Sequence, residues 1–201
     1  MNETVSYSSV VVRGQQRVDA ILAATVDLVA ERGYPALTMD AVAARANASK
    51  ATIYRRWRNK AELIKAALDA HDARQNADIP DTGSLRGDLV AVLETLRDKA
   101  SDQIAAMIEG LIAAMRHDPE LAAALREHTE NEELSPFHDA LHRAIARGEL
   151  PGDTDTELIH DVAEAMIMRQ LQIGAPFDTA FIDRLVDDVL LVLLQHRGTT
   201  Q

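Results

Sequence analysis

The sequence predicts an all-α protein in which a small head of three helices precedes a larger helical body. Apolar residues recur at the i, i+3, i+4 spacing of a helix face through most of the chain. Glycine and proline, which end or interrupt helices, fall between these periodic segments, as Gly33 and Pro35 do near the start. Charge is also unevenly divided between the first 60 residues and the rest, which supports a division into two parts.

The head begins with an arm and a long helix. Residues 1–14 are rich in Ser and Val without a clear period, so we expect a flexible arm. From Gln15 to Arg32 the apolar positions largely follow helical spacing, which predicts an amphipathic helix of about five turns. Gly33 suits the position that ends this helix, and Pro35 prevents the helix from continuing.

Two short helices with a tight turn between them follow. Thr38 is a suitable N-cap for the first helix and Ser49 for the second. Asn47 lies between them and is one of the few residue types that tolerate the left-handed backbone of such a turn. In the second helix, predicted over Lys50–Trp57, Ile53 and the terminal tryptophan share an inner face. The outward face is polar and basic, which predicts a helix-turn-helix that reads DNA.

The distribution of charge agrees with DNA binding, although the total of −11 does not. Residues 1–60 hold nine Lys or Arg against five Asp or Glu, a net charge of +4, and the remaining residues carry −15. A basic head on an acidic body is typical of proteins whose body keeps them off non-specific DNA. Chance variation of charge along the chain is the alternative explanation.

Three ordered elements within residues 15–65 carry a family resemblance. They are a G-Y-x-x-x-T entry to the first short helix, an S-x-x-T-I-Y-R second helix, and an aromatic-x-x-K junction formed by Trp57 and Lys60. Together they resemble the N-terminal domain of the tetracycline-repressor (TetR) family of transcriptional regulators. Asn47 stands where this family often has Gly. Asp40 stands where some relatives have a basic residue that contacts a base, which puts a base contact from the first short helix in doubt.

The resemblance implies a role for each matching position. Phosphate contacts are expected from Thr38, Tyr54 and Lys60. Base contacts are expected from Lys50, Ala51, Thr52 and Arg55, and Arg56 is left unassigned between the two roles. The chemistry agrees, because hydroxyl and ammonium groups suit phosphate, methyl groups can meet thymine, and Lys or Arg suits the acceptors of guanine.

The resemblance also implies the partners and the domain organisation. A homodimer is expected to bind a near-palindromic double-stranded DNA operator, most often as a repressor, and to release it when a small apolar or amphipathic effector fills the body. Asn59 is a suitable cap for a fourth helix that starts at Lys60 and joins head to body. The expected domains are the helix-turn-helix DNA-binding domain at 15–60, the connecting helix and loop at 61–79, and the ligand-binding and dimerisation domain at 80–201.

The last two predicted helices, roughly Thr156–Ile173 and Asp178–His196, are apolar on more than one face. Such helices need cover on several sides, and a partner subunit is the simplest cover. The turn E-L-P-G-D-T-D and the run P-F-D-T-A-F-I-D-R-L-V resemble the C-terminal domain of an actinobacterial TetR subgroup, which dimerises through these helices. Expected interface residues are Leu158, Val162, Met166, Leu185, Val189 and Val192. A self-contained helical core is the alternative.

Candidate ligand sites in the body are few. Adaptable Met side chains on helices that line the effector pocket in this family indicate an irregular apolar ligand, although ordinary core packing explains them as well. Expected pocket residues are Met107, Leu111, Met115, Phe137, Leu141 and Met166. His138 and His142 have the i, i+4 spacing of a helical metal site, but no third ligand is evident, so no metal or other cofactor is expected.

Composition and motifs argue against several other classes of protein. The chain has no cysteine, no apolar stretch long enough to span a membrane and no secretory signal, so we expect a cytoplasmic protein without membrane association. No phosphate-binding loop, nucleophile elbow or paired-carboxylate motif is present, so we do not expect an enzyme. The remaining alternative is a constitutive helical module for interaction or dimerisation that has no effector.

Overall fold

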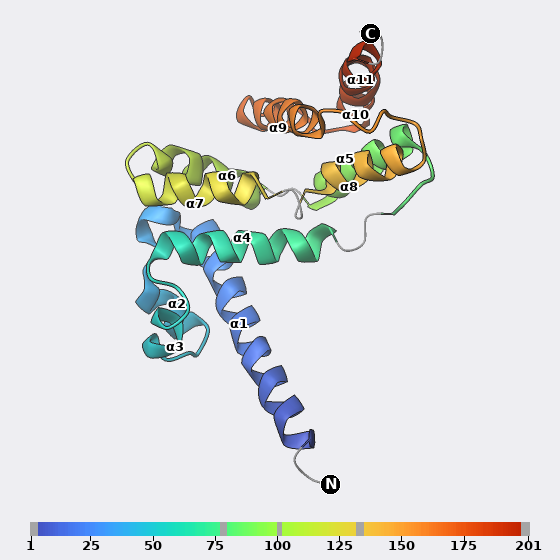
Figure 1. Ribbon diagram of the computed structural model, residues 1–201. Coiled ribbons are helices and arrows are strands. Elements are labelled where there is room, and N and C mark those ends of the chain that lie inside the picture. The colour runs from blue at the N-terminus through green and yellow to red at the C-terminus, as the bar shows by residue number, and fades with distance from the viewer. Residues whose placement is uncertain (1–3, 77–79, 100–101, 132–134, 198–201) are drawn as a thin grey trace. The chain divides into compact units, whose positions relative to one another are not determined.

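The computed structural model describes residues 4–76, 80–99, 102–131 and 135–197, and every regular element in these ranges is a helix (Figure 1). The predicted all-α class is therefore confirmed. The chain divides into a first compact unit, Met1–Arg74 with Asp102–Asn131, and a second, Gln75–Ser101 with Glu132–Gln201. None of the described helices combines the length and the apolar character that crossing a bilayer requires.

The first unit joins the predicted head to two helices from further along the chain. Its elements are α1 (Thr4–Arg32), the short 3-10 helix η1 (Tyr34–Ala36), α2 (Met39–Arg45), α3 (Lys50–Tyr54), α4 (Lys60–Asn76, except its last two residues), α6 (Asp102–Met115) and α7 (Pro119–Thr129). The helix α6 packs against α1, η1 and α7. Ile21, Leu63 and Leu121 are all fully buried in one shared core. No local sequence pattern indicates that α6 and α7 pack on the head, and the predicted domain boundaries stay a prediction.

The helix α1 differs from its predicted range at one end. It begins at Thr4 instead of Gln15, so the predicted arm is helical from residue 4, and residues 1–3 lie outside the described residues. No proline interrupts this run, and one internal glycine costs a helix only about 1 kcal/mol. At the other end Gly33 has a φ of 76°, and its N–H donates to the carbonyl of Val29 at 2.8 Å, which confirms the predicted helix end.

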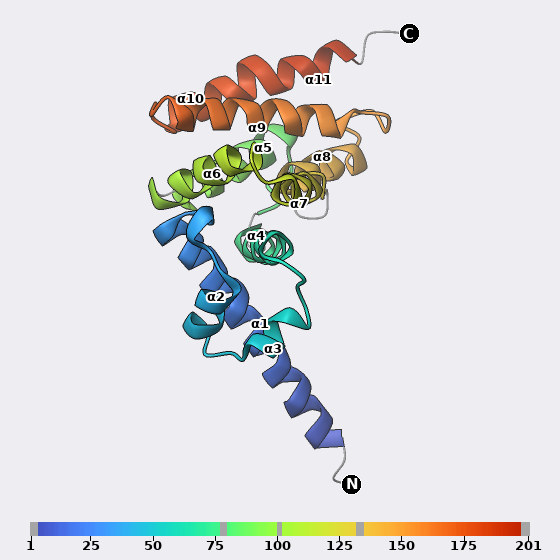
Figure 2. The same cartoon turned by 90° about the vertical axis from the view of Figure 1, so that its left-hand side faces the viewer.

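The second unit is a separate helical bundle with its own core. Its elements are α5 (Leu85–Lys99), α8 (Pro136–Ala146), α9 (Thr156–Gln172), α10 (Thr179–Leu185), a π-helical segment (Val186–Leu190) and α11 (Leu191–Arg197). The helix α5 packs against α8 and α10, and α9 packs against α8. Figure 2 shows α9 running beside the continuous α10–α11 segment. The sequence predicts one regular helix over this last segment, and the π turn is a local difference from that prediction.

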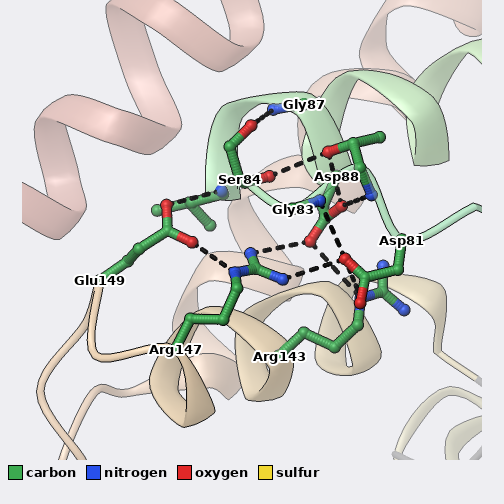
Figure 3. A network of polar contacts seen from close by, with 10 residues as sticks. Asp81, Gly83, Ser84, Gly87, Asp88, Arg143, Arg147 and Glu149 are labelled. Carbon is green, nitrogen blue, oxygen red and sulfur yellow. Dashed lines mark hydrogen bonds and ion pairs between the residues drawn. The ribbon is translucent and has the colours of Figure 1, made fainter.

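A buried carboxylate on α5, that of Asp88, links the loop before α5 to the end of α8 in the second unit (Figure 3). Asp88 is fully buried and accepts hydrogen bonds from the backbone N–H and hydroxyl of Thr82, at 2.7 and 2.8 Å. It also accepts from Arg147 at 2.9 Å and from Arg143 at 3.4 Å. Burial by itself raises the pKa of Asp88, but these donors and positive charges outweigh burial and hold the pKa below its usual value. Asp88 is therefore a fixed negative charge in this bundle.

Candidate nucleic-acid interface

Local capping sets the orientation of α3 relative to α2. The backbone N–H of Ala41 donates to the Thr38 hydroxyl at 3.1 Å, and that of Thr52 donates to the Ser49 hydroxyl at 3.2 Å. Asn47, between the two helices, has a φ of 49°, and no other described non-glycine residue has a positive φ. Both predicted N-caps and the predicted left-handed turn are therefore confirmed, and they give the geometry of a helix-turn-helix.

Apolar side chains hold the inner face of α3 in the core of the first unit. Ile53 is fully buried and Trp57 nearly so. The helix ends at Tyr54 and not at Trp57, and the N–H of Arg56 then donates to the carbonyl of Ile53, three residues back, as in a 3-10 turn. Asn59 then caps α4, accepting from the backbone N–H of Glu62 at 2.8 Å, as predicted. Residues 55–59 are thus a tight connection between two capped helices.

The outer face of α3 is open to solvent. Lys50, Ala51, Arg55 and Arg56 are exposed, and Tyr54 is 53% exposed although it is a large aromatic residue. The structure brings these predicted contact residues together on one short helix and the connection after it. The remaining predicted base contact, Thr52, is half-buried, and its hydroxyl lies 2.8 Å from that of Ser49. Hydrogen-bond donors, a hydroxyl group and a methyl group therefore lie together on the outer face of α3.

The other two predicted phosphate contacts lie at helix N-termini in the same unit. Thr38 is exposed at the start of α2, where the helix dipole favours an anion. Lys60 is half-buried at the start of α4, and its ammonium lies 4.1 Å from the centroid of the Tyr34 ring. This cation–π contact holds the end of the Lys60 side chain against the Tyr34 ring.

Polar contacts that sequence reasoning missed connect α6–α7 to the head. The hydroxyl of buried Tyr34 donates to Asp118 at 3.0 Å, and the Asn59 amide donates to Glu120 at 2.8 Å. Asp118 also caps α7, accepting from the backbone N–H of Leu121 at 3.0 Å, and this bond, more than the Tyr34 bond, lowers its pKa. Burial and then the Asp118 hydrogen bond raise the pKa of Tyr34. The Asp-Pro sequence predicts the helix start but carries no signal for a residue 84 positions away.

A second missed contact lies on the candidate interface itself. The ammonium of Lys50 donates to Asp40 on α2 at 2.6 Å, and this hydrogen bond and the charge of Asp40 raise the pKa of Lys50. Arg45 of α2 makes a comparable exposed pair with Glu31 of α1, with contacts of 2.7 and 3.0 Å. Opposite charges ten and fourteen positions apart are common by chance, so the sequence alone does not single out these pairs.

The residues predicted for the effector pocket divide between the two units. Met107 and Leu111 are buried in the first core with Met115 packed beside them, whereas Phe137 and Leu141 are buried in the second core. Met166 is half-buried against the second core. The pocket itself stays a prediction.

The histidines considered for metal binding lie in the second unit. The ring of His138 packs edge-on against that of His160, with 5.1 Å between the ring centroids, and His142 lies 6.1 Å away on the same helix. In the described ranges, no three or more His, Cys, Asp or Glu side chains are grouped so that they can hold a metal ion.

The residues predicted for the dimer interface differ in exposure. Leu158, Val162, Met166 and Val189 are half-buried in the single chain, and Val192 is 39% exposed. Leu185 is fully buried within the core of its own unit, where a partner cannot reach it, so we leave it out of the proposed interface. The spacing of apolar residues alone does not distinguish residues of the protomer's own core from residues of an interface, because both of the last two predicted helices are apolar on more than one face.

Comparisons with known proteins agree with this geometry. Residues 21–67 match the family model described as bacterial regulatory proteins of the tetR family, and residues 79–189 match a tetracyclin repressor-like C-terminal domain. The chain is 54% identical over 185 residues to the DNA-binding transcriptional repressor TetR of Mycobacteroides abscessus, covering 92% of this chain and 97% of the relative. It is also 36% identical over 176 residues to the HTH-type transcriptional regulator Rv1556 of Mycobacterium tuberculosis, covering 87% and 86%.

Solved structures show the same relationship in three dimensions. The crystal structure of the TetR family transcription regulator SCO0332 superposes with a TM-score of 0.69 at 28% identity, covering 85% of this chain and 94% of that one. Helix-turn-helix geometry, both family models and relatives matched over nearly their whole length all agree. The chain therefore belongs to the TetR family of transcriptional regulators.

Proposed function

We propose that this chain is a cytoplasmic transcriptional repressor that binds a near-palindromic DNA operator as a homodimer and releases it when a small apolar or amphipathic effector binds. The observation that carries the proposal is the exposed outer face of α3, held by two capped helices and a left-handed turn. A helix with this support fits the major groove of DNA. The relative from Mycobacteroides abscessus, named as a DNA-binding repressor, supports the same function.

The side chains of the head suit two kinds of DNA contact. Thr38, Tyr54 and Lys60 present two hydroxyls and an ammonium from three helices of one unit, which suits phosphates along a backbone. We assign the base contacts to residues of α3 and of the connection directly after it. These are Lys50, Ala51, Thr52 and Arg55, with Arg56 available for either role.

The proposal of a homodimer is supported by α9. One face of this helix is buried in the second core through Ile159, Ala163 and Ile167. Another face carries Leu158, Val162 and Met166, spaced four residues apart and only half covered in the single chain. A second copy of this chain is the occupant we propose, because a twofold protein matches a near-palindromic site. Val189 and Val192 extend the same proposed surface.

Two helices that carry methionine, α6 and α9, support an apolar or amphipathic effector, because methionine side chains adapt to irregular apolar ligands. The helices α6 and α7 share the core of the first unit with the head. A displacement of these two helices would therefore change the position of α3. A ligand that binds the two arrangements with different affinity would shift operator binding.

The test is a gel-shift titration of the purified protein with a duplex from its own upstream region, at several salt concentrations. Tyr54→Phe and Lys60→Ala should weaken all sequences alike, and the lysine change should make the salt dependence shallower by about one phosphate contact per protomer. Arg55→Ala should instead relax base preference. Arg126→Ala, which removes an exposed charge from α7, is the matched control and should change little.

Two outcomes would count against the proposal in different ways. Wild-type protein that retards no upstream fragment at low salt would exclude operator binding. A uniform loss of affinity for all three head variants, with base preference intact, would refute the division into phosphate and base contacts.

A further inference from the structure

The ion pair between α2 and α3 contributes little to the stability of the first unit. The ammonium of Lys50 and the carboxylate of Asp40 lie 2.6 Å apart, and both side chains are more than half exposed, at 63% and 57%. An exposed pair of this kind contributes at most about 1 kcal/mol to stability. A carboxylate on this surface also opposes the phosphates of any DNA that approaches. The place of Asp40 in the first turn of α2, where the helix dipole favours an anion, also contributes no more than about 1 kcal/mol. Stability therefore explains Asp40 only in small part, and general DNA affinity does not explain it.

The base edges in the major groove offer an explanation. A G·C pair presents two acceptors, N7 and O6 of guanine, followed by the N4 donor of cytosine. Lysine donates well to guanine, and aspartate accepts from cytosine N4. Lys50 and Asp40 already stand side by side as one donor and one acceptor. Their separation is close to the distance between hydrogen-bonded groups of one base pair.

We propose that Asp40 is a specificity-determining residue which, together with Lys50, reads one G·C base pair in each half-site of the operator. This inference rests on the proposed function and adds a residue to its base contacts. Replacing the G·C pair by A·T in the same orientation places the N6 donor of adenine opposite Lys50 and the O4 acceptor of thymine opposite Asp40. Lys50 then keeps only the N7 acceptor of adenine, and Asp40 faces an acceptor in place of a donor, so the pair discriminates more strongly than lysine alone.

The same pair lowers binding to unrelated DNA. On a wrong sequence the carboxylate finds no donor and faces phosphate charge, while Lys50 stays engaged with it. The contacts to cytosine N4 and guanine O6 offset this repulsion only where both groups are present. Selectivity is thus gained by making wrong sequences worse, at the expense of raw affinity.

The test starts from duplexes with a randomised core of about 20 base pairs, the length of two half-sites one helical turn apart, selected by full-length wild-type protein. Binding of the selected duplex and its single base-pair variants is then measured for wild type, Asp40→Ala, Lys50→Ala and the double variant. Glu31→Ala is the matched control, because it removes another exposed carboxylate of the same head, one that is paired to Arg45. The native fluorescence of Trp57 checks that each variant is folded.

The expected result is that Asp40→Ala and Lys50→Ala each reduce the G·C preference at the same position by about tenfold, and that the double variant loses little more. Asp40→Ala should also bind a scrambled duplex more tightly than wild type, and Glu31→Ala should keep the preference. If Asp40→Ala retains the preference that Lys50→Ala loses, the inference is overturned and operator binding stands. If wild-type protein enriches no sequence, the proposed function fails and this inference fails with it.

Discussion

Replacing Asp88 by asparagine removes a buried charge from the second unit while keeping the shape of the side chain. The carboxylate accepts bonds from Thr82 and Arg147, all at 2.9 Å or less. Losing a buried ion-pair partner typically costs about 3–5 kcal/mol. The side chains of Arg143 and Arg147 are about a quarter exposed, so water can partly solvate them once the carboxylate is gone. We therefore expect the low end of that range, about 3 kcal/mol of unfolding free energy.

Urea unfolding followed by far-ultraviolet circular dichroism measures this loss. Asp81→Asn is the matched control, because Asp81 contacts the same Arg147 at 3.2 Å but is 58% exposed, and it should cost less than about 1 kcal/mol. Since the folded-state pKa of Asp88 is depressed, its contribution is present above the unfolded pKa of about 3.9 and is lost as pH falls through the folded value. Equal losses for the two variants at pH 7 would refute the reasoning from burial.

Three further predictions concern the first unit and the proposed interface. Burial lowers the pKa of His128, but hydrogen bonds to Asp72 and Asp69 outweigh burial and raise the pKa above its usual value. The stability lost in His128→Asn should therefore be largest below about pH 6.5, and the loss should vanish as pH rises through the folded-state pKa. Denaturation at pH 5.5 and 8.5 checks this. Asn47→Ala should cost about 1 kcal/mol and Asn47→Gly almost nothing, because only alanine is strained at a φ of 49°; equal costs in urea unfolding would contradict it. Val162→Glu should weaken dimerisation by at least about tenfold in sedimentation velocity, and an unchanged dimer would move the interface elsewhere.

Features set by a few neighbouring residues could be predicted from the sequence. The caps at Thr38, Ser49 and Asn59 each act on a backbone N–H three residues later, so the sequence holds both partners within one turn. The left-handed Asn47 and the start of α7 at Pro119 are likewise local. These elements were sufficient to position α3, which is why most of the candidate interface could be predicted.

Features set by packing between distant segments could not be predicted. Tyr34 and Asp118 are far apart in sequence, and nothing near either residue specifies the other. The π turn at Val186–Leu190 interrupts a run whose periodicity fits a regular helix equally well. The sequence also does not show which way Leu185 points. An apolar residue on a helix that is apolar on several faces can point into its own core or toward a partner.

Recognition of a specific operator by this chain can be measured by equilibrium binding of the full-length protein to a fluorescent duplex from its upstream region. A scrambled duplex of equal length and composition is measured in parallel over a range of salt concentrations. We expect binding to the upstream duplex to be at least about a thousandfold tighter than binding to the scrambled duplex, with an affinity that falls as salt rises. Equal affinity for the two duplexes at every salt concentration would contradict it.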